Sequence, residues 1–185
     1  MRKQAISGVI AIAGALMFIA IVAGLQAAQN VYDPVQQLMS ELALGPHGEI
    51  MLEAFLALAV SIAALAFGLP GQNRLLKTAL AVSALCFVVA GICPLGAATE
   101  LHVAAVALGF IAAGLAMYLL PSASRFQGVP WRVASWGLLS AMGVAVVLGH
   151  ALIPAGVSQR LAAAALLGWV GACGWRLVCD GPPDH

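Results

Sequence analysis

Hydrophobic residues occupy long, nearly unbroken stretches of this chain, and polar residues gather in the short segments between them. Crossing roughly 30 Å of hydrocarbon takes about 20 residues of α-helix, and six stretches reach this length. The pattern therefore predicts an all-α polytopic membrane protein, with residues 1–185 forming a single integral membrane domain built as a six-transmembrane-helix bundle. The predicted spans are residues 5–28, 49–69, 76–94, 101–120, 133–153 and 160–179.

A short segment between the first two stretches has a different pattern and predicts one amphipathic helix over residues 34–44. Asp33 suits the capping position, Pro34 the first helical position, and Gly45 the position after the end. We expect this helix to lie over the outer end of the bundle as a lid. Its apolar face consists of Val35, Leu38, Met39 and Leu42, spaced as i, i+3, i+4 and i+7.

The composition agrees with a membrane location and excludes two classes of protein. Hydrophobic residues make up 63% of the chain and charged residues 8%, whereas a soluble domain carries about 25% charged residues. A chain of this composition has too few polar groups to cover its surface in water. The formal net charge of +1 provides no basic face for nucleic acid.

The positions of the basic residues predict the orientation in the membrane. With six spans, seven of the eight Lys and Arg residues fall on one side, and only Arg160 falls on the other. We expect the protein to lie in the cell inner membrane. The positive-inside rule then predicts that both termini are in the cytoplasm and that residues 34–44 are outside. The seven residues are Arg2, Lys3, Arg74, Lys77, Arg125, Arg132 and Arg176.

Four spans each carry one ionisable residue near the predicted outer end. Ionisable groups inside a membrane are costly unless they are paired or hydrated, so they usually line a cavity or a path. Three of the four share a helix face with small residues, which mark close helix contacts and hence the bundle interior. These small residues are Ala105 and Gly109 in the span of His102, Gly143 in that of His150, and Ala164, Gly168 and Gly171 in that of Arg160. We therefore expect Glu53, His102, His150 and Arg160 to converge on one outward-facing polar pocket.

Several roles remain open for these residues. Arg160 can form an ion pair with Glu41, Glu49, Glu53 or Glu100, hold an anionic ligand, or be solvated in its loop. The histidines can be hydrogen-bonded members of the bundle or metal ligands, and His102 and His150 can ligate haem together. Neither H-x-x-x-H nor H-E-x-x-H spacing occurs, so no metal or cofactor is assigned.

Three segments resemble the DUF998 family of small prokaryotic multi-pass membrane proteins, and more distantly Frag1/DRAM-type proteins. The segments are YDPVQQLMSELALG at 32–45, GICPLG at 91–96 with Leu-His at 101–102, and GVSQRLAAAALLGW at 156–169. Residues that match the family pattern are Ser40, Glu41, Leu42, Gly91, Pro94, His102, Arg160 and Trp169. This chain has Leu95 and Gly96 where many members carry an acid after the proline. The resemblance implies a multi-pass membrane fold and no established activity.

Together these patterns predict a pocket that binds a membrane lipid headgroup or a small amphiphile. Two alternatives remain open. One is a metal-dependent membrane lipid hydrolase that uses His102, His150 and a carboxylate. Separately, Ser40 next to Glu41 can be a nucleophile beside a carboxylate or a solvated residue on the polar edge of the helix. The other is a structural or accessory subunit that forms a homo-oligomer or packs on a membrane partner protein. The candidate ligand-binding residues are Ser40, Glu41, Glu53, His102, His150 and Arg160.

Overall fold

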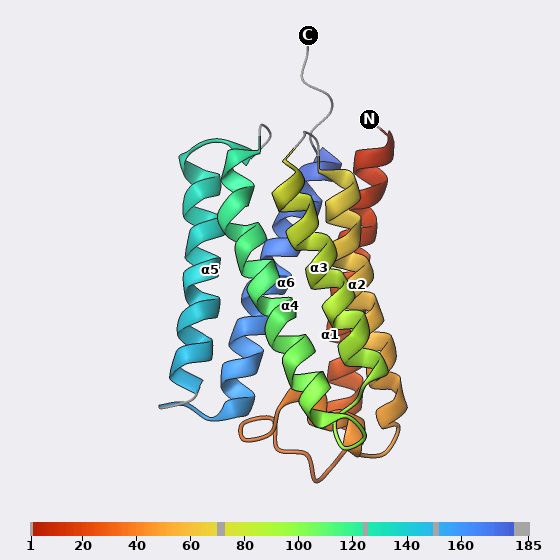
Figure 1. Cartoon of the computed structure of the whole chain (residues 1–185). Helices are drawn as coiled ribbons and strands as arrows, with labels where there is room; N and C mark the ends of the chain where they lie inside the picture. The colour runs from red at the N-terminus through yellow and green to blue at the C-terminus, as the bar shows by residue number, and fades with distance from the viewer. Residues whose placement is uncertain (1, 70–72, 124–125, 150–151, 180–185) are drawn as a thin grey trace.

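The computed structural model describes residues 2–69, 73–123, 126–149 and 152–179, which form six long α-helices (Figure 1). All six are long and apolar enough to cross a membrane, and no strand occurs within the described ranges. The all-α, six-helix prediction is therefore confirmed. The helices are α1 (Arg2–Ala28), α2 (Met51–Gly68), α3 (Arg74–Ile92), α4 (Thr99–Leu119), α5 (Val129–Gly149) and α6 (Ala155–Cys179).

Three short 3-10 helices lie between them in the described ranges. The helix ends differ from the predicted ones by a few residues. The short helices are η1 (Met39–Leu44), η2 (Gly48–Ile50) and η3 (Leu120–Ser122). The largest shift is in α6, which begins at Ala155 instead of residue 160. Pro154 directly precedes this start, where a residue without an amide hydrogen is well tolerated. Arg160 therefore lies in the second turn of α6.

Consecutive helices run antiparallel and pack side by side, and α6 closes the bundle by packing against α1 (Figure 1). The contact between α4 and α5 is much the weakest of the consecutive pairs, because α5 packs mainly on α6. Only Ser135, Met142 and Ala145 of α5 are buried among its described residues. The bundle therefore has a loose seam between α4 and α5.

Side-chain hydrogen bonds fasten α5 to its neighbours at two levels. Near one end, the Ser135 hydroxyl donates to the Met117 carbonyl of α4 at 2.6 Å and accepts from the Trp169 indole of α6 at 2.9 Å. Near the other end, the Ser158 hydroxyl of α6 donates to the Ala145 carbonyl at 2.8 Å. Because this second bond joins α5 to α6 only, α4 is free to diverge from α5 there.

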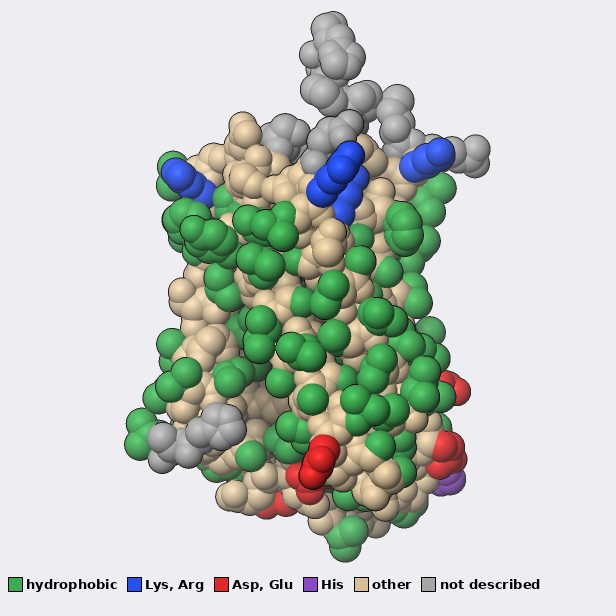
Figure 2. Space-filling view, viewed as in Figure 1, with side chains coloured by type: hydrophobic (Ala, Val, Ile, Leu, Met, Phe, Trp, Pro, Cys, Tyr) green, Lys and Arg blue, Asp and Glu red, His purple; other side chains and the backbone are tan. Residues whose placement is uncertain are grey.

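The two ends of the bundle differ in charge (Figure 2). Helix α1 begins and α6 ends at the basic end, where Arg132 lies over the Trp136 ring and Arg176 over the Trp131 ring. Acidic residues gather at the opposite, acidic end, with the α1–α2 loop and the start of α6. We use these two names below. This separation follows the distribution of basic residues seen in the sequence.

Candidate functional site

The α1–α2 loop, residues 29–47, crosses the acidic end of the bundle and is called the first loop below. Its only helical part in the structure is η1 (Met39–Leu44), so the prediction of a helix over residues 34–44 is wrong for its first turn. Residues 34–36 form a turn instead, closed by the Gln37 amide, which donates to the Asp33 carbonyl at 2.8 Å.

Hydrogen bonds to α6 explain why this single turn does not continue as an α-helix. In an α-helix the Met39 amide would donate to the Val35 carbonyl. Here the Met39 amide donates to the Gln159 side chain at 2.6 Å, and the Val35 carbonyl accepts from the Val157 amide at 3.2 Å. Both partners of the missing helical bond are therefore used to hold the first loop on the start of α6.

Arg160 strengthens the same attachment. Its guanidinium donates to the carbonyls of Gln37 at 3.2 Å and Gly156 at 3.0 Å, and to the Tyr32 hydroxyl at 2.6 Å. The expected salt bridge to Glu41, Glu53 or Glu100 is thus replaced, in the described part of the chain, by bonds to neutral oxygens. Burial raises the pKa of the Tyr32 phenol, and the Arg160 charge opposes that rise.

Glu41 also has a structural role in the first loop. One carboxylate oxygen accepts from the Leu38 amide at 2.9 Å, and the other accepts from the Gln37 side chain at 3.2 Å. The carboxylate therefore caps the start of η1. It does not contact the neighbouring Ser40 hydroxyl, so these two residues do not form the nucleophile and base that their adjacency suggested.

His102 is buried in the first turns of α4, with 2% of its surface exposed. Its Nδ1 atom lies 2.8 Å from the Ala90 carbonyl oxygen and 3.0 Å from that of Cys93. Carbonyls at the end of a helix lack partners within it, so His102 caps the end of α3. The other ring nitrogen, Nε2, is buried and has no hydrogen-bond partner among the residues that the structure describes.

A groove of about 760 Å³ runs along the seam between α4 and α5 and is called the α4–α5 groove below. Residues of α6 and the first loop complete its wall, and its lining is mostly apolar, from Tyr118 toward the basic end to Leu38 at the acidic end. Figure 2 shows the surface hollowed between α5 and α4. The polar side chains Ser40, His102, Ser158 and Gln159 line its acidic end.

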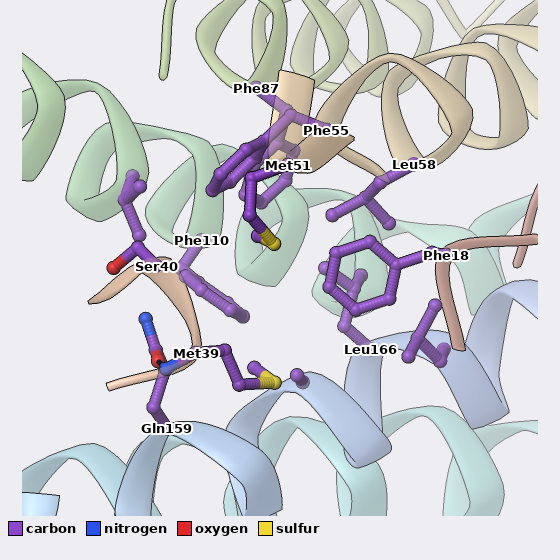
Figure 3. Close-up of a pocket in the computed structure, with 13 residues that line it drawn as sticks. Phe18, Met39, Ser40, Met51, Phe55, Leu58, Phe87, Phe110, Gln159 and Leu166 are labelled. Atoms are coloured by element: carbon purple, nitrogen blue, oxygen red, sulfur yellow. Dashed lines mark hydrogen bonds between the residues drawn. The ribbon is translucent and has the colours of Figure 1, made fainter. Parts of the chain in front are cut away.

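A small enclosed cavity of about 20 Å³ lies beside this groove (Figure 3). Ser40 and Gln159 line both spaces, and in Figure 3 they lie across the cavity from Phe18 and Leu58. The volume is enough for about one water molecule. Ser40 is 2% exposed, and its hydroxyl forms no hydrogen bond within the described chain.

The predicted convergence of four ionisable residues on one pocket is wrong. His102 lines the α4–α5 groove, whereas Arg160 lines a separate groove of about 530 Å³ between α1 and α6. Glu53 is exposed on α2 and lines neither groove. His150 lies outside the described residues. Of the candidate residues, the structure thus brings Ser40 and His102 together in one groove.

The rotation of α6 explains why Arg160 was misplaced. Its predicted interior face carries Ala164, Gly168 and Gly171, but all three line the open groove against α1. Ala164 and Gly168 are exposed there. In α4, by contrast, Ala105 and Gly109 are buried as predicted. Small residues therefore marked the interior face in one helix and an open face in the other.

Metal-ligand spacing was weak in the sequence, and the described residues contain no group of three or more His, Cys, Asp or Glu side chains that could hold a metal ion. Of the four free cysteines, Cys86 lies in α3, Cys93 directly follows it, and Cys173 and Cys179 lie in α6. The metal-dependent hydrolase alternative therefore has no supporting cluster in the described ranges.

Three polar residues that organise this end of the molecule were not singled out from the sequence. Gln29 donates to the Leu42 and Pro46 carbonyls, each at 2.9 Å. Tyr32 accepts from Arg160, and Gln159 accepts from the first loop. Gln159 and Tyr32 lie within the segments that carry the family resemblance. Their position in these segments was the only indication of their role that the sequence offered.

The helices, the charged ends and the groove define a polytopic membrane protein with a lateral groove open between two helices. The model of a family described as "Protein of unknown function (DUF998)" matches residues 11–176. The chain therefore belongs to the DUF998 family. No curated protein and no solved structure matches it.

Proposed function

We propose that this protein binds a membrane amphiphile in the α4–α5 groove, with the polar head of the ligand at the acidic end. The observation that supports this most is the division of the groove lining: apolar side chains of α4 and α5 along its length, and four polar side chains at one end. An amphiphile has the same division. The proposed binding site is therefore this groove, in place of the pocket of ionisable residues that the sequence predicted.

The dimensions of the groove suit a lipid chain. From His102 to Tyr118 the lining follows α4 over sixteen residues, which is about 24 Å at 1.5 Å per residue. The hydrocarbon core of a bilayer is about 30 Å thick. The groove opens through the loose α4–α5 seam, so a ligand can enter sideways from the membrane without passing through water.

We also propose an orientation for the protein in the inner membrane. The acidic end faces outward, and both termini face the cytoplasm. Single cysteines in a cysteine-free background test it with an impermeant maleimide. Asn30→Cys and Ala97→Cys, both exposed at the acidic end, should react in intact cells. Gln127→Cys, exposed at the basic end, should react only after permeabilisation. Reaction of Gln127→Cys in intact cells would reverse the orientation.

Photolabelling tests the binding itself. A diazirine-bearing long-chain lipid is added to the protein in nanodiscs, and cross-linked residues are identified by peptide mass spectrometry. We expect saturable labelling of groove residues such as Val106, Phe110 and Val146, which an unlabelled amphiphile suppresses. The exposed residues Val60 and Leu85 on α2 and α3 serve as reference. Equal, unsaturable labelling of both sets would contradict the proposal and leave the accessory-subunit alternative.

A further inference from the structure

His102 lines the polar end of the α4–α5 groove, and one of its ring nitrogens is buried without a hydrogen-bond partner among the described residues. The Nδ1 atom of His102 faces two carbonyl oxygens, at 2.8 Å and 3.0 Å. Carbonyls only accept, so Nδ1 carries the hydrogen, and in a neutral imidazole Nε2 is then an acceptor. No described group donates to Nε2, although it is buried. A ligand that donates a hydrogen bond would satisfy it.

The remaining polar groups restrict the ligand further. The Ser158 hydroxyl is used by the Ala145 carbonyl, and the Gln159 carbonyl oxygen by the Met39 amide. The Ser40 hydroxyl has no partner and can both donate and accept. Within the described residues no Lys, Arg, Asp or Glu lines the groove. Only the carbonyl oxygen of the Gln159 amide is used in this way, so its nitrogen adds donors. The site therefore offers an acceptor at His102, a donor–acceptor at Ser40, donors at Gln159 and no formal charge.

We infer that the amphiphile is a neutral lipid alcohol, whose hydroxyl donates to His102 Nε2 and accepts from Ser40. The inference rests on the proposed function and names the ligand class. A hydroxyl is the smallest head group with both a donor and an acceptor. A phosphate or carboxylate presents acceptors to the His102 acceptor and finds no cation in the groove, because Arg160 lines the separate groove between α1 and α6.

Competition between matched ligands tests this class. A diazirine-bearing C16 alcohol is bound to the protein in nanodiscs and displaced by hexadecanol, by its methyl ether, or by hexadecanoate. The ether has the same chain but cannot donate a hydrogen bond. Leaving a buried polar group without a partner costs about 1–3 kcal/mol, which at 1.4 kcal/mol per tenfold is a preference of about fivefold or more for the alcohol.

Variants of His102 and Ser40 test whether these two residues bind the hydroxyl of the alcohol. His102→Phe keeps an aromatic ring beside Phe55, whose ring centroid is 5.5 Å from that of His102, but it cannot accept. We expect it to bind the alcohol no better than the ether. Ser40→Ala should weaken binding of both the alcohol and the ether, because both oxygens can accept from Ser40, and it should leave the preference for the alcohol in place. Ser140→Ala, exposed on α5 outside the groove, should match the unmodified protein.

The outcomes separate the two proposals. Equal displacement by alcohol and ether, or stronger displacement by hexadecanoate, would overturn the alcohol inference while groove binding stands. Failure of every competitor would overturn groove binding itself. If His102→Phe does not fold, the comparison of alcohol and ether on the unmodified protein and on Ser40→Ala still tests the alcohol inference.

Discussion

Replacing Gly156 with alanine is expected to lift the first loop from α6 and to lower the stability of the bundle. A methyl group at Gly156 would lie 2.6 Å from the Pro34 carbonyl oxygen, 2.7 Å from that of Val35 and closer still to that of Gln37. All three atoms are backbone, so no side chain can rotate away. Such overpacking typically costs about 1–3 kcal/mol.

Two measurements check this effect. The melting temperature in detergent should fall by about 2–12 °C, given roughly 2–4 °C per kcal/mol for a chain of this size. Amide hydrogen exchange should accelerate over residues 33–39, because the Val157–Val35 and Met39–Gln159 hydrogen bonds are lost.

Gly168→Ala is the matched control, since it lies in the same helix and an added methyl group would have nothing within 4 Å. Alanine favours helix over glycine by about 1 kcal/mol, so this variant should be as stable as the unmodified protein or more so. A melting temperature for Gly156→Ala equal to that of Gly168→Ala would show that the first loop does not press on α6 as described.

The number of helices and the positions of their ends were predictable because they follow from length and hydrophobicity. A run of about 20 apolar residues can satisfy its backbone groups in lipid only as a helix. Chain breaks at Pro154 and in the polar loops then fix the ends within a few residues. The separation of charge between the two ends could be predicted for the same reason, from the loop positions of Lys and Arg.

The rotation of each helix was not predictable, because lipid-facing and interior surfaces are both apolar in a membrane protein. Leu101, His102 and Val103 differ in burial although the pattern around them is uniformly hydrophobic: the two aliphatic residues are exposed and the histidine is buried. Glu53 was therefore assigned to the interior on depth alone, and Arg160 on depth and the small residues of its helix face, and the structure places both elsewhere.

The shape of the first loop escaped prediction for a different reason. Its apolar spacing is that of an α-helix, and η1 does bury Met39 and Leu42. The partners that keep the helix from continuing past its first turn, Val157 and Gln159, are more than 100 residues away in the chain. Local periodicity contains no information about these hydrogen bonds, so the structure was needed to locate them and the groove beside them.

Filling the α4–α5 groove is expected to abolish amphiphile binding, and the helix α5 offers a matched pair of sites for this test. Gly143 lines the groove and Gly137 does not. A Cβ atom added at either glycine would have nothing within 4 Å. The Cβ of a tryptophan therefore fits at both positions without a backbone clash. Gly143→Trp places an indole where the ligand chain would lie, whereas Gly137→Trp leaves the groove open.

The most direct measurement is the affinity of both variants for the diazirine-bearing C16 alcohol in nanodiscs, read from saturable cross-linking. Gly143→Trp should lose at least about tenfold in affinity, equivalent to 1.4 kcal/mol, while both variants remain folded by melting temperature. Gly137→Trp should bind like the unmodified protein. Saturable binding that is equally strong in Gly143→Trp and Gly137→Trp would contradict a ligand site in the α4–α5 groove.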